Sequence, residues 1–167
     1  MRRDREFEEF VGARSDALRR TAFLMCGDWH LAEDALQDAL VKLYVAWPRV
    51  RREGTENSYV RQIVARTIID QRRRPWRRER VMHTPPDLVA SEYHHHDREP
   101  LAAALAEVPL KQRTVLVLRF WEDMSVQEVA DELNISEGTV KSQTSRGLER
   151  IRQVLAQHEQ LEGIGNE

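Results

Sequence analysis

The side chains of residues 136–146 carry hydrogen-bonding groups of the kinds that can contact nucleic acid. Hydroxyl, amide, ammonium and guanidinium groups donate to phosphate oxygens and to base edges in a DNA groove. At helical spacing, these residues fall in the first turns of one helix, whose first residues are mostly small polar and basic ones. This pattern predicts a DNA-recognition helix, whose candidate contacts are Ser136, Gly138, Thr139, Lys141, Ser142, Gln143, Ser145 and Arg146.

A helix-turn-helix is the element that would position these side chains. Ser125 and Glu128 have the S-x-x-E spacing of a capping box, which predicts that a helix begins at about residue 126. Asn134 tolerates the left-handed conformation that ends a helix, and Ser136 can cap the next one. Apolar residues at helical spacing predict which side of the two helices is buried. In the first helix and the turn these are Val129, Ala130, Leu133 and Ile135, and in the second helix they are Val140, Leu148, Ile151 and Leu155.

A second group of candidates is basic and lies in the first half of the chain. The 167 residues have a net charge of −2. Residues 1–80 nevertheless carry 18 Lys and Arg against 13 Asp and Glu, whereas residues 81–167 carry 8 against 15. Residues 49–80 alone hold 11 arginines and 4 acids. A segregated basic surface of this kind steers a polyanion even when the whole chain is acidic.

Apolar residues recur at helical spacing almost throughout, so the expected fold class is all-α. Helices are predicted over residues 4–25 and 29–47 and from residue 57 or 58 into the arginine-rich tail, with Pro48 opening a loop up to residue 57. Residues 81–100 lose this periodicity and gain prolines and histidines, which indicates a linker. Beyond it, Pro109 is expected at the first position of a further helix. The expected architecture is two small helical bundles joined by a flexible linker, with the helix-turn-helix in the C-terminal bundle.

Several other classes of protein are disfavoured. No apolar run is long enough to span a bilayer, and MRRDREFEEF lacks the apolar core of a signal peptide, which predicts a soluble, cytoplasmic protein without membrane insertion. No nucleophile–base pair or phosphate loop is present, so we expect neither an enzyme nor a cofactor. The run from His94 to His96 cannot hold one metal tetrahedrally, so no metal is expected. For Cys26, a buried structural thiol is favoured over a reactive one.

Four segments of the chain form an ordered series of motifs. They are AEDALQDALVKLYVAW at residues 32–47, SYVRQIVARTIIDQRRR at 58–74, PLKQRTVLVLRF at 109–120 and GTVKS at 138–142. Their order and spacing closely resemble the extracytoplasmic-function (ECF) sigma factors of bacterial RNA polymerase, over nearly the whole chain. The segments TVKSQTSRGL and RRRPWRRE are similar to an actinobacterial subgroup of that family.

The resemblance implies a division of labour. Residues 1–80 would be a region 2-like domain that binds core RNA polymerase and recognises and melts the −10 element. Residues 81–100 would be a linker, residues 101–160 a region 4-like helix-turn-helix domain that recognises the −35 element, and residues 161–167 a tail. The expected partners are therefore the largest subunits of core polymerase, promoter DNA and an anti-sigma protein that holds both bundles.

The resemblance also assigns residues to these surfaces. The polymerase-binding residues would be Asp34, Leu36, Gln37 and Asp38. The −10 contacts would be Arg51, Arg52, Asn57, Ser58, Tyr59, Arg61, Gln62, Arg66, Arg72, Arg73, Arg74, Arg77 and Arg78, and the −35 contacts are the eight residues of the recognition helix. Tyr59 and Trp47 fit either a platform for stacking bases or a place in the core.

The chain departs from the family pattern at three positions. Thr67 stands where many members carry Asn, and Gln143 and Thr144 replace the commoner Arg and Leu. The promoter preference of relatives is therefore not transferred to this chain. An alternative function stays open, namely a self-sufficient helix-turn-helix regulator whose N-terminal bundle serves sensing or dimerisation.

Overall fold

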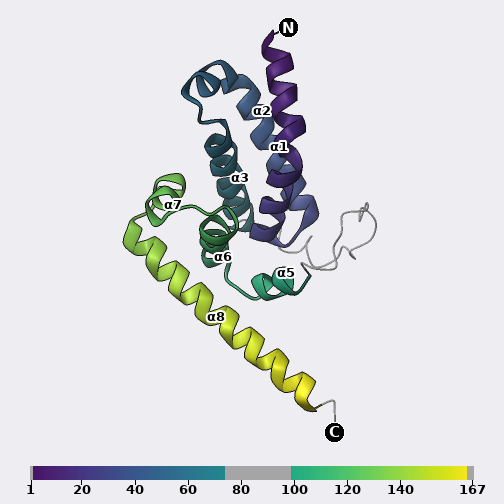
Figure 1. The fold of residues 1–167 in the computed structure, drawn as a ribbon, viewed down its shortest axis with the longest axis vertical. Coiled ribbons are helices and arrows are strands. Elements are labelled where there is room, and N and C mark those ends of the chain that lie inside the picture. Colours follow the sequence, from purple (N-terminus) through teal and green to yellow (C-terminus); the bar gives the residue numbers. More distant parts are fainter. Residues whose placement is uncertain (1, 74–98, 165–167) are drawn as a thin grey trace.

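The computed structural model describes residues 2–73 and 99–164, and every regular element in these ranges is a helix (Figure 1). The N-terminal bundle consists of α1 (Arg2–Cys26), α2 (Trp29–Glu53) and α3 (Glu56–Arg73). The C-terminal bundle consists of α5 (Glu99–Ala106), α6 (Leu110–Leu116), the π-helical turn η1 (Val117–Trp121), α7 (Val126–Leu133) and α8 (Glu137–Ile164). The all-α class is confirmed for these ranges. The expected linker lies outside them, apart from its last two residues, which begin α5.

The corner between α1 and α2 is built by local signals. Gly27 adopts a φ of 69°, and its amide donates to the carbonyl of Phe23 at 2.7 Å. The Asp28 carboxylate then accepts from the Leu31 amide at 3.1 Å and caps α2. The Cys26 thiol is buried and donates to the carbonyl of Asp28 at 3.2 Å. The predicted buried thiol is thereby confirmed.

α2 does not end at Pro48, as expected from the sequence, but continues to Glu53. Proline has no amide hydrogen, so the carbonyl of Tyr44, four residues earlier, loses its helical donor. The Arg3 guanidinium on α1 donates to that carbonyl instead. Trp47, next to the proline, is only 2% exposed and anchors this part of the helix in the core. The expected stop is therefore wrong, because a side chain from another helix satisfies the orphaned carbonyl.

The connection from α2 to α3 is correspondingly short. Gly54 has a φ of 68°, a conformation that glycine adopts without the steric cost of a Cβ, and its amide donates to the carbonyl of Arg51 at 3.3 Å. Since α3 begins at Glu56, only two residues separate the helices. Arg51 and Arg52, expected in a loop, lie in the last turn of α2.

The junction between α5 and α6 is closed by a buried arginine. Arg113 is 7% exposed, and its guanidinium donates to the carbonyls of Ala106 and Val108, each at 3.1 Å. These carbonyls lie at and just beyond the end of α5, so the arginine serves as its C-terminal cap. Pro109 precedes the first residue of α6, Leu110, one position earlier than expected.

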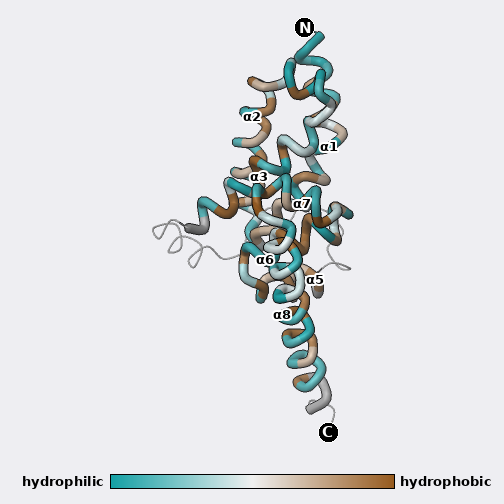
Figure 2. Tube along the Cα trace, turned by 90° about the vertical axis from the view of Figure 1, so that its left-hand side faces the viewer, coloured by the Kyte–Doolittle hydropathy of each residue, from teal (hydrophilic) through white to brown (hydrophobic). Residues whose placement is uncertain are grey.

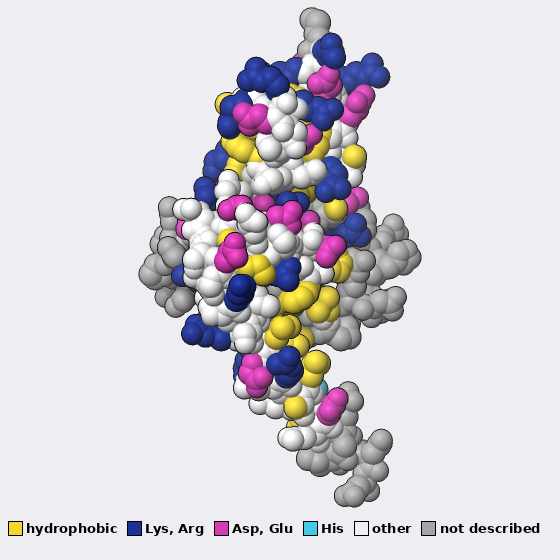
Figure 3. Space-filling model, turned by 60° about the vertical axis from the view of Figure 1, so that its left-hand side comes forward, with side chains coloured by type: hydrophobic (Ala, Val, Ile, Leu, Met, Phe, Trp, Pro, Cys, Tyr) yellow, Lys and Arg dark blue, Asp and Glu magenta, His cyan; other side chains and the backbone are white. Residues whose placement is uncertain are grey.

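α8 is the longest helix, and its distal part leaves the bundle (Figure 1). Val140 is fully buried, and Leu148 and Ile151 pack against the core, as expected. Leu155 is 49% exposed, whereas Val154 is 3% exposed, so the expectation for Leu155 is wrong. The reason is that the covered face is turned toward α5. One turn before Val154, the Arg150 guanidinium donates to the carbonyl of Glu107, directly after α5, at 3.2 Å. Exposed hydrophobic side chains gather on the lower part of the molecule, around α8 (Figure 3).

The two bundles pack against each other. α6 and η1 lie against α1, and α7 lies against α3. Buried side chains from both bundles form one continuous cluster. Figure 2 shows the hydrophobic stretches concentrated in the middle of the molecule, where α3, α6 and α7 meet. We call this packing of the two bundles the closed arrangement. In it α7, the first helix of the helix-turn-helix, faces α3, the helix expected to hold the −10 strand. None of the described helices combines the length and apolarity that a membrane span needs.

Candidate nucleic-acid interface

The predicted capping box opens α7. The Ser125 hydroxyl accepts from the Glu128 amide at 3.1 Å, and the Glu128 carboxylate accepts from the Ser125 amide at 2.6 Å. This backbone hydrogen bond holds the pKa of Glu128 below its usual value. At the other end Asn134 has a φ of 54°, and the amide of Ile135 donates to the carbonyl of Ala130 at 3.0 Å. The predicted turn is confirmed.

Three hydroxyl groups among the candidate DNA contacts form hydrogen bonds that stabilise the start of α8. The Ser136 hydroxyl accepts from the Thr139 amide at 3.0 Å and lies 2.8 Å from the Thr139 hydroxyl. The Ser142 hydroxyl donates to the carbonyl of Thr139 at 3.1 Å. A hydroxyl has one donor and two acceptor positions, so each keeps part of its capacity for a phosphate or a base.

The side chains of Lys141, Ser145 and Arg146 are exposed on α8, and that of Gln143 is half-buried. Gly138, also exposed, leaves the first turn of the helix without a side chain that would obstruct a neighbouring backbone. Lys141 and Ser145 are four residues apart and thus share a face. This face has the donors and the positive charge that a duplex groove and its phosphates require.

Gly147 positions α8, the candidate recognition helix, although the sequence pattern did not single it out. A Cβ atom there would lie 2.8 Å from the Leu116 Cδ1 atom and 3.4 Å from the Gln112 Cβ atom. α8 therefore crosses α6 at a distance that only glycine permits without a shift. A glycine inside a strongly helical pattern is the signal that could have revealed this contact.

The candidates at the start of α3 are held by ion pairs and hydrogen bonds. The Arg51 guanidinium lies 2.8 Å from the carboxylate of Glu56, which is 8% exposed. The side-chain oxygen of Asn57 accepts from Nε of Arg14 on α1 at 3.0 Å. Arg52 is exposed. The structure thus brings Arg51 and Asn57 to the same helix junction and leaves Arg52 pointing to solvent.

Three further −10 candidates, Ser58, Arg61 and Gln62, all bond to one residue of the C-terminal bundle, Glu132. Glu132 lies on α7 and is 5% exposed. The face of α3 on which these three residues lie is therefore covered by the helix-turn-helix in the closed arrangement.

The two aromatic candidates differ in their surroundings. Trp47 packs edge-on against Phe7 and contacts Phe10 in the core, so it belongs to the hydrophobic core and not to an exposed stacking surface. Tyr59 is half-buried, with the guanidinium carbon of Arg49 5.9 Å from the ring centroid. Tyr59 also packs against the hydrophobic core, so its position beside a cation is compatible with either of its two expected places.

The remaining arginine candidates are only partly described. Arg66 is exposed on α3. Arg72 and Arg73 close α3, but their side chains lie outside the described part, as do residues Arg74, Arg77 and Arg78 entirely. The histidine run at residues 94–96 is outside it too. Within residues 2–73 and 99–164, no cluster of three or more His, Cys, Asp or Glu is placed to hold a metal ion.

The candidate polymerase-binding residues lie on α2. Asp34 and Gln37 are exposed, and Asp38 pairs with Lys42 at 2.7 Å. Leu36, however, is 1% exposed. We correct its assignment on this ground, since a side chain inside the core positions the helix but offers no surface to a partner.

Two exposed valines extend the same face of α2. Val41 is 65% exposed and Val45 is 73% exposed. Val41 follows Asp38 by three residues and precedes Val45 by four, so all three side chains form one stripe. The sequence pattern did not bring out the valines, although a helical wheel places them outside the core-facing set. We call Asp34, Gln37, Asp38, Val41 and Val45 the α2 stripe.

Comparison with known proteins identifies the class. The model of sigma-70 region 2 matches residues 10–78, and that of sigma-70 region 4 matches residues 98–151. The chain is 39% identical over 156 residues to the RNA polymerase sigma-E factor of Streptomyces avermitilis, covering 90% of the chain and 85% of the relative. The chain therefore belongs to the sigma-70 family of RNA polymerase sigma factors.

Further relatives define the group within the family. The sigma-E factor of Streptomyces coelicolor is 38% identical over 157 residues, covering 90% of the chain and 86% of the relative. The ECF RNA polymerase sigma factor SigE of Mycolicibacterium smegmatis is 28% identical, covering 91% of the chain and 62% of the relative. The chain is an ECF sigma factor with relatives among actinobacteria.

A solved structure shares the fold. The sigma factor RpoE of Bartonella quintana, in complex with the anti-sigma factor NepR, matches with a TM-score of 0.71 and 22% identity. The match covers 90% of the chain and 97% of that structure's chain. The match extends over both bundles, so this chain and that structure share the fold of both.

Proposed function

We propose that this sigma factor binds core RNA polymerase, directs it to particular promoters and starts transcription there. The N-terminal bundle would capture the melted −10 strand, and the helix-turn-helix would hold the −35 duplex. The observation that carries this proposal is the presence of three separate surfaces on one chain: the α2 stripe, the polar and basic side of α3, and the first turns of α8. A self-sufficient regulator would need only the last of these. The protein would act as a binding subunit rather than as an enzyme, in the cytoplasm, where polymerase meets the chromosome.

Core-dependent transcription of whole genomic DNA tests this proposal at every promoter at once. Fragmented genomic DNA is transcribed by core polymerase with and without the protein, and the new RNA 5′ ends are sequenced. We expect ends that appear only when both components are present and that share upstream sequence elements. If no such ends appear while the isolated protein footprints duplex DNA, the regulator function is correct instead.

The α2 stripe is proposed as the docking surface for core polymerase. Its acidic residues suit a basic partner, and its exposed valines supply apolar area that would be buried on docking. Asp34→Arg with Asp38→Arg should abolish co-elution with core polymerase and leave the far-UV circular dichroism spectrum unchanged. Glu8→Arg with Glu9→Arg, which reverses two exposed acids on α1, is the matched control. Co-elution of the α2 variant at the level of this control would refute the assignment.

Regulation by an anti-sigma protein is proposed from the likeness to RpoE, whose structure was solved with an anti-sigma factor. Such a protein would bind surfaces that promoter DNA or polymerase also needs. Affinity capture with the full chain from its native cells, followed by addition of the captured protein to the transcription reaction, tests this. We expect dose-dependent inhibition, and a captured protein without effect on transcription would not be an anti-sigma factor.

A further inference from the structure

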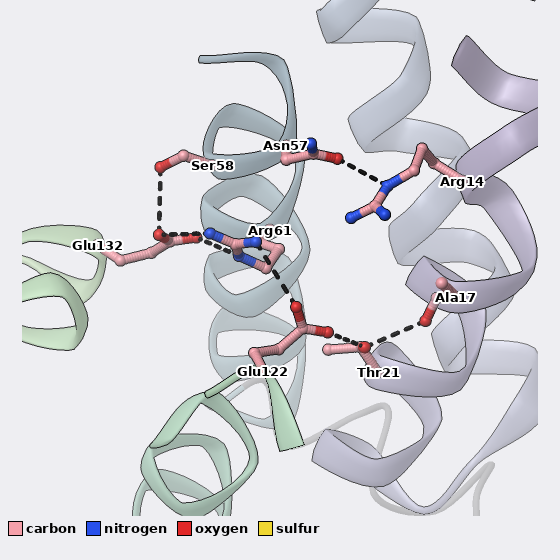
Figure 4. A network of polar contacts seen from close by, with 8 residues as sticks. All are labelled: Arg14, Ala17, Thr21, Asn57, Ser58, Arg61, Glu122 and Glu132. Atoms are coloured by element: carbon pink, nitrogen blue, oxygen red, sulfur yellow. Dashed lines mark hydrogen bonds and ion pairs between the residues drawn. The ribbon is translucent and has the colours of Figure 1, made fainter. Parts of the chain in front are cut away.

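One buried carboxylate joins the two bundles. Glu132 on α7 accepts from Nε of Arg61 at 3.1 Å and from the hydroxyl of Ser58 at 3.1 Å, both on α3 (Figure 4). Its backbone carbonyl accepts from the side-chain amide of Gln62 at 3.0 Å. The Glu132 side chain is only 3% exposed, and that of Arg61 is 17% exposed. This is a desolvated, charge-assisted contact, unlike the solvated ion pairs on the outer faces of the helices.

A second carboxylate binds the same guanidinium. Nη1 of Arg61 lies 3.6 Å from Glu122, which also accepts a hydrogen bond from the hydroxyl of Thr21 on α1 (Figure 4). Glu122 follows η1, and its amide donates to the carbonyl of Val117, five residues earlier, at 3.0 Å. This wider turn belongs to the segment that brings the carboxylate to the N-terminal bundle. We call Glu122 and Glu132, with the side chains they bind, the latch.

The donors in the latch are those that a nucleic-acid strand needs. A guanidinium, a hydroxyl and a side-chain amide bind the oxygens of phosphates and of base edges as they bind a carboxylate. Ser58, Arg61 and Gln62 are also three of the residues assigned to the −10 strand. A strand and Glu132 cannot occupy these donors at the same time.

We propose that Glu132 is an internal substitute for a nucleic-acid phosphate, which closes the −10 site until the bundles separate. This inference rests on the proposed function of the α3 face. Single-stranded DNA would then bind only after Glu132 and Glu122 have left Arg61. Polymerase, by binding the α2 stripe away from the latch, can stabilise the open form only through contacts that the closed form cannot make.

The closed arrangement masks one promoter site and not the other. Lys141, Ser145 and Arg146 remain exposed on α8 while Glu132 covers α3. The isolated protein should therefore contact duplex DNA through α8 and bind single strands weakly. Opening the latch should strengthen single-strand binding and leave duplex binding by α8 unchanged.

The test uses the full chain without polymerase and replaces both carboxylates by amides, in Glu122→Gln with Glu132→Gln. Asp131→Asn, an exposed acid on the same helix, is the matched control. Small-angle scattering measures the radius of gyration, and hydrogen exchange reports on residues 58–62. Fluorescence anisotropy with a mixed-sequence single-stranded oligonucleotide of about 20 nucleotides measures binding.

The double variant should have a larger radius of gyration and faster hydrogen exchange at residues 58–62. It should also bind the oligonucleotide roughly tenfold more tightly, which is the gain expected if the closed state is about ten times as populated as the open state before the change. Its salt dependence should steepen by about 0.7 in slope, because one more phosphate is contacted. Asp131→Asn should match the unchanged protein in all three measurements.

Two results would overturn the inference, and only the second would also count against the proposed −10 assignment. An unchanged radius and unchanged exchange would refute the latch and leave the proposed function to the transcription assay. An open variant that binds the oligonucleotide no better would refute the phosphate substitution, together with the −10 assignment of these residues. If the double variant unfolds by circular dichroism, the exchanged pair Arg61→Glu with Glu132→Arg decides, in a Glu122→Gln background that removes the carboxylate facing position 61. The exchanged pair should restore the compact radius that Arg61→Glu loses in the same background, and failure to do so counts against the latch.

Discussion

The close crossing of α6 and α8 makes a specific prediction for Gly147→Ala. The added Cβ atom would lie 2.8 Å from Cδ1 and 3.1 Å from Cγ of Leu116. Ordinary contact begins at 3.4 Å, so the helices or the leucine must move by 0.6 Å at the nearer atom to reach it. Leu116 is 4% exposed, so its side chain would have to shift inside the packed core. The substitution therefore strains the support of the recognition helix.

Two opposing effects set the magnitude. Inserting a methyl group into a packed core costs about 1–3 kcal/mol. Alanine is a better helix former than glycine by about 1 kcal/mol. The net loss in the free energy of unfolding should be about 1 kcal/mol, or roughly 2–4 °C in Tm for a chain of this length. Gly12→Ala in α1, where a Cβ atom would meet nothing within 4 Å, should instead gain about 1 kcal/mol.

The assay compares the stability of Gly147→Ala with that of Gly12→Ala. Thermal and urea unfolding followed by circular dichroism should separate the two variants by about 1–3 kcal/mol, because helix propensity cancels in the difference. Leu116→Ala alone should cost about 2–5 kcal/mol, because it empties a buried site. Combined with Gly147→Ala it should cost less than the sum of the two single changes, since the clash is removed, and the double-mutant cycle measures that coupling. If Gly147→Ala is as stabilising as Gly12→Ala, α8 does not depend on the missing side chain and the reasoning fails.

Three further outcomes follow from the geometry of the helix-turn-helix. The Ser125 amide lowers the pKa of Glu128 below its usual value of 4.5. The stability that the ionised Glu128 contributes is therefore present above pH 4.5 and is lost as the pH falls through the lower pKa of the folded state. Glu128→Gln should flatten the acid limb of a stability–pH curve, and a limb of unchanged steepness would contradict this. Asn134→Gly should change stability by a few tenths of a kcal/mol, whereas Asn134→Ala should lose about 1 kcal/mol in urea unfolding because of the positive φ; equal stabilities would rule out strain. Lys141→Ala and Arg146→Ala should each flatten the dependence of log K on log salt for upstream promoter duplex by about 0.9, and unchanged slopes for both would remove them from the interface.

The features that could be predicted from the sequence are those decided within a few neighbouring residues. The capping box needs only Ser125 and Glu128, three residues apart, and the left-handed turn needs only Asn134. Gly27 and Asp28 likewise end one helix and cap the next without help from distant residues. The order of the motifs also predicted the family, because each motif is local and their spacing is read directly from the chain.

The features that were missed depend on residues far apart in sequence. α2 continues through Pro48 because Arg3 reaches the carbonyl of Tyr44, and no window around the proline contains that arginine. Leu155 is exposed because α8 meets α5 at that level. Glu132 was not singled out from the sequence, because only the packing of α7 on α3 buries it.

The latch joins the acidic and the basic halves of the chain at one point. Glu122 and Glu132 come from residues 81–167, where acids outnumber basic residues, and Arg61 comes from residues 1–80, where basic residues outnumber acids. Because Glu122 and Glu132 both bind Arg61, the latch and a strand bound at the proposed −10 site would exclude each other at a single guanidinium. Replacing Arg61 would therefore open the protein and remove a strand contact together, and such a variant would be inactive under either account. Replacing the glutamates separates the two effects, since they belong to the closed state alone.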